Sequence, residues 1–202
     1  YPFIRMNSGA TAPEWYTPAV ATSDFVLLST VTASSSASVS FDGLFSSTYT
    51  NYMVKVTNAI PSSDNQNFRL RVRKSNADIT DSWYYGWQSG SERYSGGQNF
   101  GDQGSGWWAE SEHRMSDHSG ACDSDVEAGG WCGDVRIFNP LSTTHRHFIH
   151  TEYVHQNNTM SNVIGGQGRM QTATSGSALS GVSFYFGSGD IAEGVFKLYG
   201  LK

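Results

Sequence analysis

Apolar and polar residues alternate with a period of two along most of this chain. In FRLRVRK, residues 68–74, the apolar residues Phe68, Leu70 and Val72 fall on one side of an extended chain and the basic residues on the other, because successive side chains of a strand point to opposite faces. Polar turn segments such as NAIPSSDNQN separate the alternating runs. The pattern predicts about eight strands, at residues 24–33, 38–45, 51–60, 68–75, 134–141, 145–156, 181–187 and 195–202.

These strands predict an all-β fold, an antiparallel β-sandwich of jelly-roll type, because each strand has an apolar side that a second sheet can cover. The 202 residues suit one such domain, which we expect to span residues 25–202. Residues 1–24 contain Pro2, Pro13 and Pro18. Proline lacks a backbone donor and discourages regular structure, so this part is predicted to be an extended N-terminal arm.

The alternation breaks between Trp83 and Cys132, a stretch that contains five of the six tryptophans. Long stretches without periodicity are uncommon in compact domains and are usually functional or flexible. We therefore interpret residues 83–132 as a long aromatic, Gly-rich loop insertion into the sandwich.

Charge and hydropathy exclude two classes of partner. Only 15% of the residues are charged and the net charge is −5, which provides no basic surface for a phosphate backbone, so nucleic acid is not an expected partner. No apolar run approaches the roughly 20 residues that cross a bilayer, so no membrane insertion is expected.

Two separated segments carry a family resemblance: SVSFDGLFSSTYTNYMVKVTNAIPSSDNQNFRLRVRKSN, residues 38–76, and the closing GSGDIAEGVFKLYGLK, residues 187–202. Together they resemble the terminal β-domain of virion proteins of tailed bacteriophages, which ends in a Gly-x-hydrophobic-Leu-Tyr-Gly motif. The matching residues are Phe41, Gly43, Leu44, Tyr49, Tyr52, Pro61, Arg69, Leu70, Arg71, Gly194, Leu198, Tyr199 and Gly200.

The resemblance implies a structural, non-enzymatic role on the virion surface, in a tail fibre or other appendage that attaches to a host glycan. A capsid-surface decoration or short head fibre is the alternative within the same family. The resemblance also implies a homo-oligomer, commonly a homotrimer, and we expect the N-terminal arm to contact other virion proteins. A carbohydrate-binding module outside a virion is a further alternative.

The aromatic residues of the 83–132 segment are the main candidates for ligand binding. Rigid aromatic area beside small polar residues is also the composition of antibody binding loops. These rings could present their faces to sugar C–H groups, hold the loop on the sandwich, or pack between protomers. The candidates are Trp83, Tyr84, Tyr85, Trp87, Trp107 and Trp108.

Arg69, Arg71 and Arg73 are a second candidate set, because they lie on one face of their strand. They could bind phosphate or carboxylate groups of a surface polysaccharide. Alternatively, they form a charged outer face that also prevents edge pairing.

The two cysteines, Cys122 and Cys132, could form one disulfide across an eleven-residue loop, or remain free thiols. The spacing of His145 and His147 could place a metal ion at a trimer axis, but a solvated strand or an interface is the simpler interpretation. No nucleophile elbow of the Gly-x-Ser-x-Gly type is present. We therefore expect no enzyme, no metal and no cofactor.

Overall fold

A computed structural model of the chain describes residues 3–16, 23–81, 84–94, 97–116, 121–157, 163–172 and 177–202. In this part of the chain the regular structure is all β, apart from one short 3₁₀ turn, η1 (Val126–Ala128). No helix among the described residues is long and apolar enough to span a bilayer. The expected all-β fold is confirmed.

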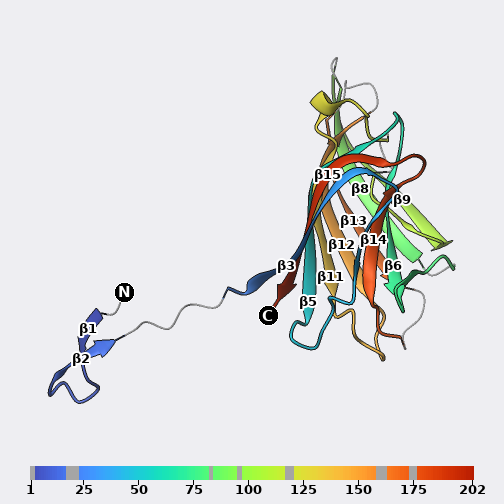
Figure 1. The fold of residues 1–202 in the computed structure, drawn as a ribbon. Helices are drawn as coiled ribbons and strands as arrows, with labels where there is room; N and C mark the ends of the chain where they lie inside the picture. The colour runs from blue at the N-terminus through green and yellow to red at the C-terminus, as the bar shows by residue number, and fades with distance from the viewer. Residues whose placement is uncertain are drawn as a thin grey trace.

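The larger of the two main sheets has eight strands in the order β3-β15-β5-β11-β12-β13-β8-β9, with every neighbouring pair antiparallel (Figure 1). Its strands are β3 (Phe25–Ser36), β15 (Ile191–Leu201), β5 (Asn51–Pro61), β11 (Trp131–Phe138), β12 (Phe148–Gln156), β13 (Val163–Thr172), β8 (Tyr84–Tyr94) and β9 (Gly97–Glu110).

The smaller sheet covers one face of the larger one and has the order β10-β6-β14-β4, with β7 also paired to β6. Its strands are β4 (Val39–Asp42), β6 (Phe68–Lys74), β7 (Ala77–Asp78), β10 (His113–Arg114) and β14 (Gly181–Phe186). These sheets form the predicted antiparallel sandwich. Its jelly-roll connectivity stays a prediction.

The core lies between the sheets and is built from the apolar sides of alternating strands. Phe68 of β6 contacts the rings of Trp131 in β11, Phe184 and Phe186 in β14, and Phe196 in β15, with centroid distances of 5.0 to 6.3 Å. All five side chains are buried. Burying a large aromatic side chain stabilises a fold by about 2 to 3 kcal/mol, so this cluster is a principal link between the two sheets.

Two parts of the family resemblance, the tyrosine turn and the closing motif, meet at the end of the large sheet. A Cβ atom added to Gly200 in β15 would lie 2.5 Å from Cγ of Tyr49, so the Tyr49 ring needs the bare backbone of a glycine. The nearby Tyr52 hydroxyl donates to the carbonyl of Ser46 at 2.9 Å and accepts its N–H at 2.6 Å. The closing Leu-Tyr-Gly sequence is therefore packed against the tyrosine turn more than 140 residues earlier in the chain.

The segment expected to be a loop insertion is largely strand. β8 and β9 form a hairpin at the edge of the large sheet, and β8 pairs with β13 over ten residues. Alternation does not reveal these strands because glycines and small polar residues interrupt their apolar positions, and backbone pairing does not need an apolar side. Among the described residues of this segment, the irregular ones lie between β9 and β11, a region that also contains β10 and η1.

The described part of the N-terminal arm is a hairpin rather than a single extended segment. β1 (Phe3–Met6) pairs with β2 (Pro13–Tyr16), and Figure 1 draws the hairpin apart from the sandwich. Pro13 fits because it is the first residue of its strand, where a missing donor is tolerated. On one face of the hairpin, Arg5 bonds Glu14 at 2.9 Å and lies 4.0 Å from the ring centroid of Tyr16.

Candidate functional site

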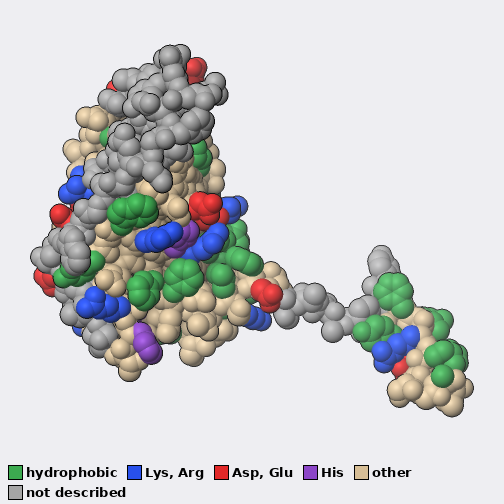
Figure 2. Space-filling model, turned by 180° about the vertical axis from the view of Figure 1, so that it is seen from behind, with side chains coloured by type: hydrophobic (Ala, Val, Ile, Leu, Met, Phe, Trp, Pro, Cys, Tyr) green, Lys and Arg blue, Asp and Glu red, His purple; other side chains and the backbone are tan. Residues whose placement is uncertain are grey.

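An open groove of about 690 Å³ crosses the outer face of the large sheet, opposite the face that packs on the smaller sheet. Its lining residues come from β8, β13, β12 and β11. Ile149 and Met170 are among them, but their side chains are buried on the core side of the sheet, so they line the groove through their backbone. Figure 2 shows hydrophobic side chains gathered on this side of the molecule, with basic side chains among them.

One row of groove residues is mainly aromatic. The strand registers pair Phe138 with Phe148, Phe148 with Gln171, and Gln171 with Tyr85. Paired residues of neighbouring strands lie on the same face and within about 5.5 Å of each other. Phe148 is 54% exposed and Phe138 41% exposed, so the row offers ring surface to solvent around one amide side chain.

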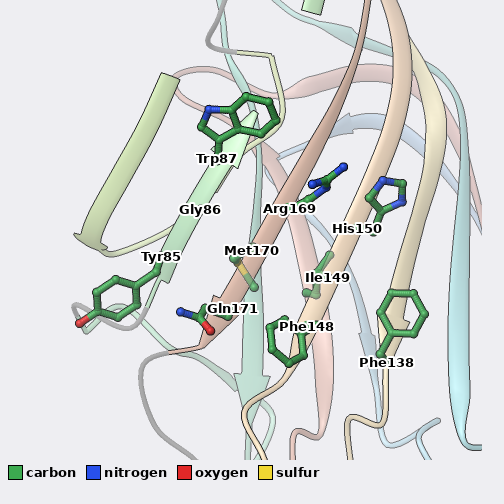
Figure 3. A pocket seen from close by; sticks show the side chains of 10 residues that line it. All are labelled: Tyr85, Gly86, Trp87, Phe138, Phe148, Ile149, His150, Arg169, Met170 and Gln171. Carbon is green, nitrogen blue, oxygen red and sulfur yellow. The ribbon is translucent and has the colours of Figure 1, made fainter. Parts of the chain in front are cut away.

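The adjacent row is basic and ends in a tryptophan. Its registers pair Arg136 with His150, His150 with Arg169, and Arg169 with Trp87. Trp87 is 43% exposed. Figure 3 shows Arg169 between Trp87 and His150, on three neighbouring strands. Aromatic surface and hydrogen-bond donors thus lie side by side in one groove.

The two arginines of this row differ in their partners. Arg136 lies 3.7 Å from the carboxylate of Glu152, in an exposed pair. Arg169 donates to the neutral amide oxygen of Gln167 at 3.5 Å. Among the described residues, no carboxylate forms an ion pair with Arg169, so its charge is available to a ligand in the groove.

Two of the six aromatic candidates, Tyr85 and Trp87, line this groove. Tyr84 points the other way and is buried, since neighbouring residues of a strand alternate. The Tyr84 hydroxyl donates to the carbonyl of Ile79 at 2.8 Å and accepts the N–H of Val72 at 3.0 Å. Burial raises the pKa of Tyr84, which suits a structural role in joining β8 to the smaller sheet.

The other aromatic candidates are located only in part. The backbone of Trp107 and Trp108 belongs to β9, where Trp107 pairs with Gly86, but their side chains lie outside the described residues. Trp83 also lies outside them. A contribution of these three rings to binding stays a prediction.

The arginine stripe of β6 lies on the outer face of the smaller sheet and is engaged within the chain. Glu112 accepts from Arg69 at 2.6 Å and from Arg71 at 3.3 Å. The hydroxyl of Tyr185 donates to Glu112 at 2.6 Å, and burial, followed by this hydrogen bond, raises the pKa of Tyr185.

The third arginine of the stripe, Arg73, pairs with Asp42 at 2.8 Å and with Asp78. Desolvation lowers the pKa of Arg73, but the two carboxylates outweigh this effect and raise it. All three guanidinium groups are therefore matched by carboxylates of this chain, in contrast to that of Arg169.

Both cysteines are free thiols, so the candidate disulfide between Cys122 and Cys132 is not formed. Cys122 is fully buried and pairs through its backbone with Gln66 and Asn157, and burial raises the pKa of its thiol to about 12. The sulfur of Cys132 instead accepts the backbone N–H of Asn58 at 3.2 Å.

The histidines that suggested a metal site occupy different environments. His145 is exposed, whereas His147 is buried and its Nε2 lies 3.1 Å from the carbonyl of Ser142. Burial lowers the pKa of His147. Among the described residues, no group of three or more His, Cys, Asp or Glu side chains could hold a metal ion.

Several groove residues were not among the sequence-based candidates, notably Phe138, Phe148, His150 and Arg169. For Phe148 and His150 a signal existed, because the alternation in 145–156 places them on the face opposite His147 and Ile149. Arg169 lies in GGQGRMQT, where the glycines conceal any alternation.

Comparison of this chain with models of protein families, with curated proteins and with solved structures finds no match.

Proposed function

We propose that this chain is a non-enzymatic structural protein of a tailed-bacteriophage virion, and that its sandwich attaches the particle to a saccharide on the host surface. The resemblance at residues 38–76 and 187–202 supports the virion part of this proposal. The observation that carries the attachment part is the outer groove, with exposed aromatic rings next to hydrogen-bonding side chains.

The groove has the chemistry that a saccharide needs. Sugar rings present C–H groups that pack on aromatic faces, and hydroxyl groups that require donors and acceptors. Trp87, Phe148 and Tyr85 provide ring surface, while Gln171 and His150 provide polar atoms. The volume of about 690 Å³ lies within the range of about 300 to 1,000 Å³ that is usual for small-molecule sites. A sheet face is also a rigid support, so little order must be created on binding.

The test is binding of the purified protein to a glycan array and to isolated host polysaccharide, with Trp87→Ala compared with Trp15→Ala. Both tryptophans are exposed, but Trp15 lies in the N-terminal hairpin. We expect Trp87→Ala to weaken saccharide binding about tenfold, which corresponds to about 1.4 kcal/mol, and Trp15→Ala to leave it unchanged. If the unaltered protein binds no saccharide, or if both variants bind as it does, the groove is not an attachment site.

A second candidate, a capsid-surface decoration or short head fibre, is supported by the hairpin. On the face opposite the Arg5–Glu14 pair, Ile4, Met6 and Trp15 are all exposed, Trp15 by 74%. An isolated two-stranded hairpin is marginally stable in water, so this apolar face gains stability when it is covered by another virion protein or by a neighbouring subunit of a homotrimer.

Deletion of residues 1–24 tests this assembly role. The sandwich should keep its melting temperature, because its core includes no residue of the hairpin, whereas trimer formation and incorporation into particles should be lost. Analytical ultracentrifugation measures trimer formation, and the protein composition of purified particles measures incorporation. An unchanged oligomer that still enters particles would exclude the hairpin as an assembly element.

A further inference from the structure

We propose that the saccharide bound in the groove is acidic, with a carboxylate held by Arg169 and the sugar ring placed against Trp87. This inference rests on the attachment function proposed above and specifies the chemical class of its ligand.

The guanidinium group of Arg169 has few partners among the described residues. Its side chain is exposed in the groove, and the hydrogen bond it forms is long and goes to an uncharged amide. A guanidinium group has five N–H donors in a planar fork that matches a carboxylate. Counting partners among the described residues, most donors of Arg169 are therefore available to a ligand.

Other basic side chains of this chain, in contrast to that of Arg169, are paired with carboxylates. Arg73 is matched by Asp42 and Asp78, and Lys55 by Asp134 at 3.1 Å on the same outer sheet face as the groove. A chain with 13 basic and 18 acidic residues can easily supply such partners. An arginine without a carboxylate partner among the described residues, in an aromatic groove, indicates that its counter-charge comes from a ligand.

The neighbours of Arg169 also favour an anion. His150 is its register partner on β12, and Arg136 is the partner of His150 on β11. In the described part of the chain, the carboxylate that pairs with a member of this row is that of Glu152, which is exposed and lies 3.7 Å from Arg136. Because the whole chain carries a charge of −5, an acidic ligand would otherwise be repelled, and this local group of donors offsets the repulsion.

The aromatic walls distinguish an acidic saccharide from a simple anion. Trp87 is the register partner of Arg169 on the other side, in β8, and neighbouring strands are about 4.8 Å apart. A ring that packs on the indole can therefore present a carboxylate to the guanidinium group within the same sugar unit. An inorganic anion would use Arg169 but would gain nothing from Trp87 or Phe148.

The experiment measures, by isothermal titration calorimetry, binding of the full chain to a hexamer of galacturonic acid, to its methyl ester, and to a sulfated hexasaccharide. We expect the acid to bind at least tenfold more tightly than the uncharged ester, since hydrogen bonds to charged groups are worth more than neutral ones. Arg169→Gln should remove this difference, and Arg169→Lys should retain only part of it, because lysine lacks the bidentate fork. Arg146→Gln is the matched control, because Arg146 is exposed and is not a groove residue.

Each outcome decides between the proposals. The acidic-ligand inference fails if the acid and the ester bind equally, or if Arg169→Gln keeps the preference for the acid. In either case, saccharide binding that still depends on Trp87 would leave the attachment function intact. Tighter binding of the sulfated hexasaccharide through Arg169 would replace carboxylate by sulfate and overturn the carboxylate assignment. If no saccharide binds here or on the glycan array, both proposals fail.

Discussion

The buried imidazole of His113 should make this fold sensitive to mild acid. His113 lies in β10, opposite Leu70 of β6, and is fully buried. A Cβ atom added to Gly168 of β13 would lie 3.4 Å from the His113 ring. The ring therefore fills the space between the two sheets and packs against β13, the strand that carries Arg169 on its outer face.

Burial lowers the pKa of His113 from its ordinary value near 6.5 to about 3. The folded protein therefore keeps this imidazole neutral, whereas the unfolded chain binds a proton as the pH falls below 6.5. Its contribution to stability is complete above pH 6.5 and is lost progressively as the pH falls towards 3. Each pH unit in this window costs about 1.4 kcal/mol, so between neutral pH and pH 5 the loss from this one group is about 2 kcal/mol.

Urea denaturation followed by tryptophan fluorescence, at pH 7.5 and at pH 5, measures this loss. The unaltered protein and His113→Gln should differ by about 2 kcal/mol in how much stability they lose between the two pH values, since glutamine does not titrate. His145→Gln is the matched control, because His145 is exposed and should change nothing. An equal pH dependence in all three proteins, or an NMR titration of the His113 ring near pH 6.5, would refute the reasoning.

Two further substitutions test the packing of the sheets. Glu112→Gln should lower the free energy of unfolding by about 3 kcal/mol, because it removes the charge of a buried carboxylate that two partly buried arginines share. The exposed Glu127→Gln is its control, and a loss below about 0.5 kcal/mol, measured by urea denaturation, would contradict the prediction. Gly200→Ala should cost about 1 to 3 kcal/mol because its methyl group meets the Tyr49 ring. In a double-mutant cycle, Tyr49→Ala should remove most of that cost, and simple additivity would show that the two residues are not coupled.

Alternation was sufficient to predict the sandwich. All eight runs identified from the sequence overlap strands of the structure, from β3 at residue 25 to β15, which ends at residue 201. The reason is local. A strand with one apolar side places that side in the core, so apolar residues recur at every second position of its sequence. The face of β12 that carries Ile149, Thr151 and Tyr153 is buried as a continuous set for the same reason.

The strands without alternation could not be found in this way. β8, β9 and β13 contain glycines and small polar residues, and they are held in the sheet by backbone hydrogen bonds to their neighbours. Such bonds depend on which segments meet in space. The β1–β2 hairpin was missed for a related reason, since its prolines suggested an irregular segment, whereas Pro13 begins a strand.

The candidate site depended most on the tertiary structure. From the sequence, Trp87 and Tyr85 could be chosen for their chemistry, but Phe138, Phe148 and Arg169 become their neighbours only through the registers of β11, β12, β13 and β8. Charge pairing was equally hidden, because Arg69 and Arg71 meet Glu112 from a distant part of the chain while Arg169 has no such partner among the described residues. Side-chain periodicity is a local property, so it can be recognised in the sequence. Strand register and ion pairing are contacts between distant segments, so they are determined only when the chain folds.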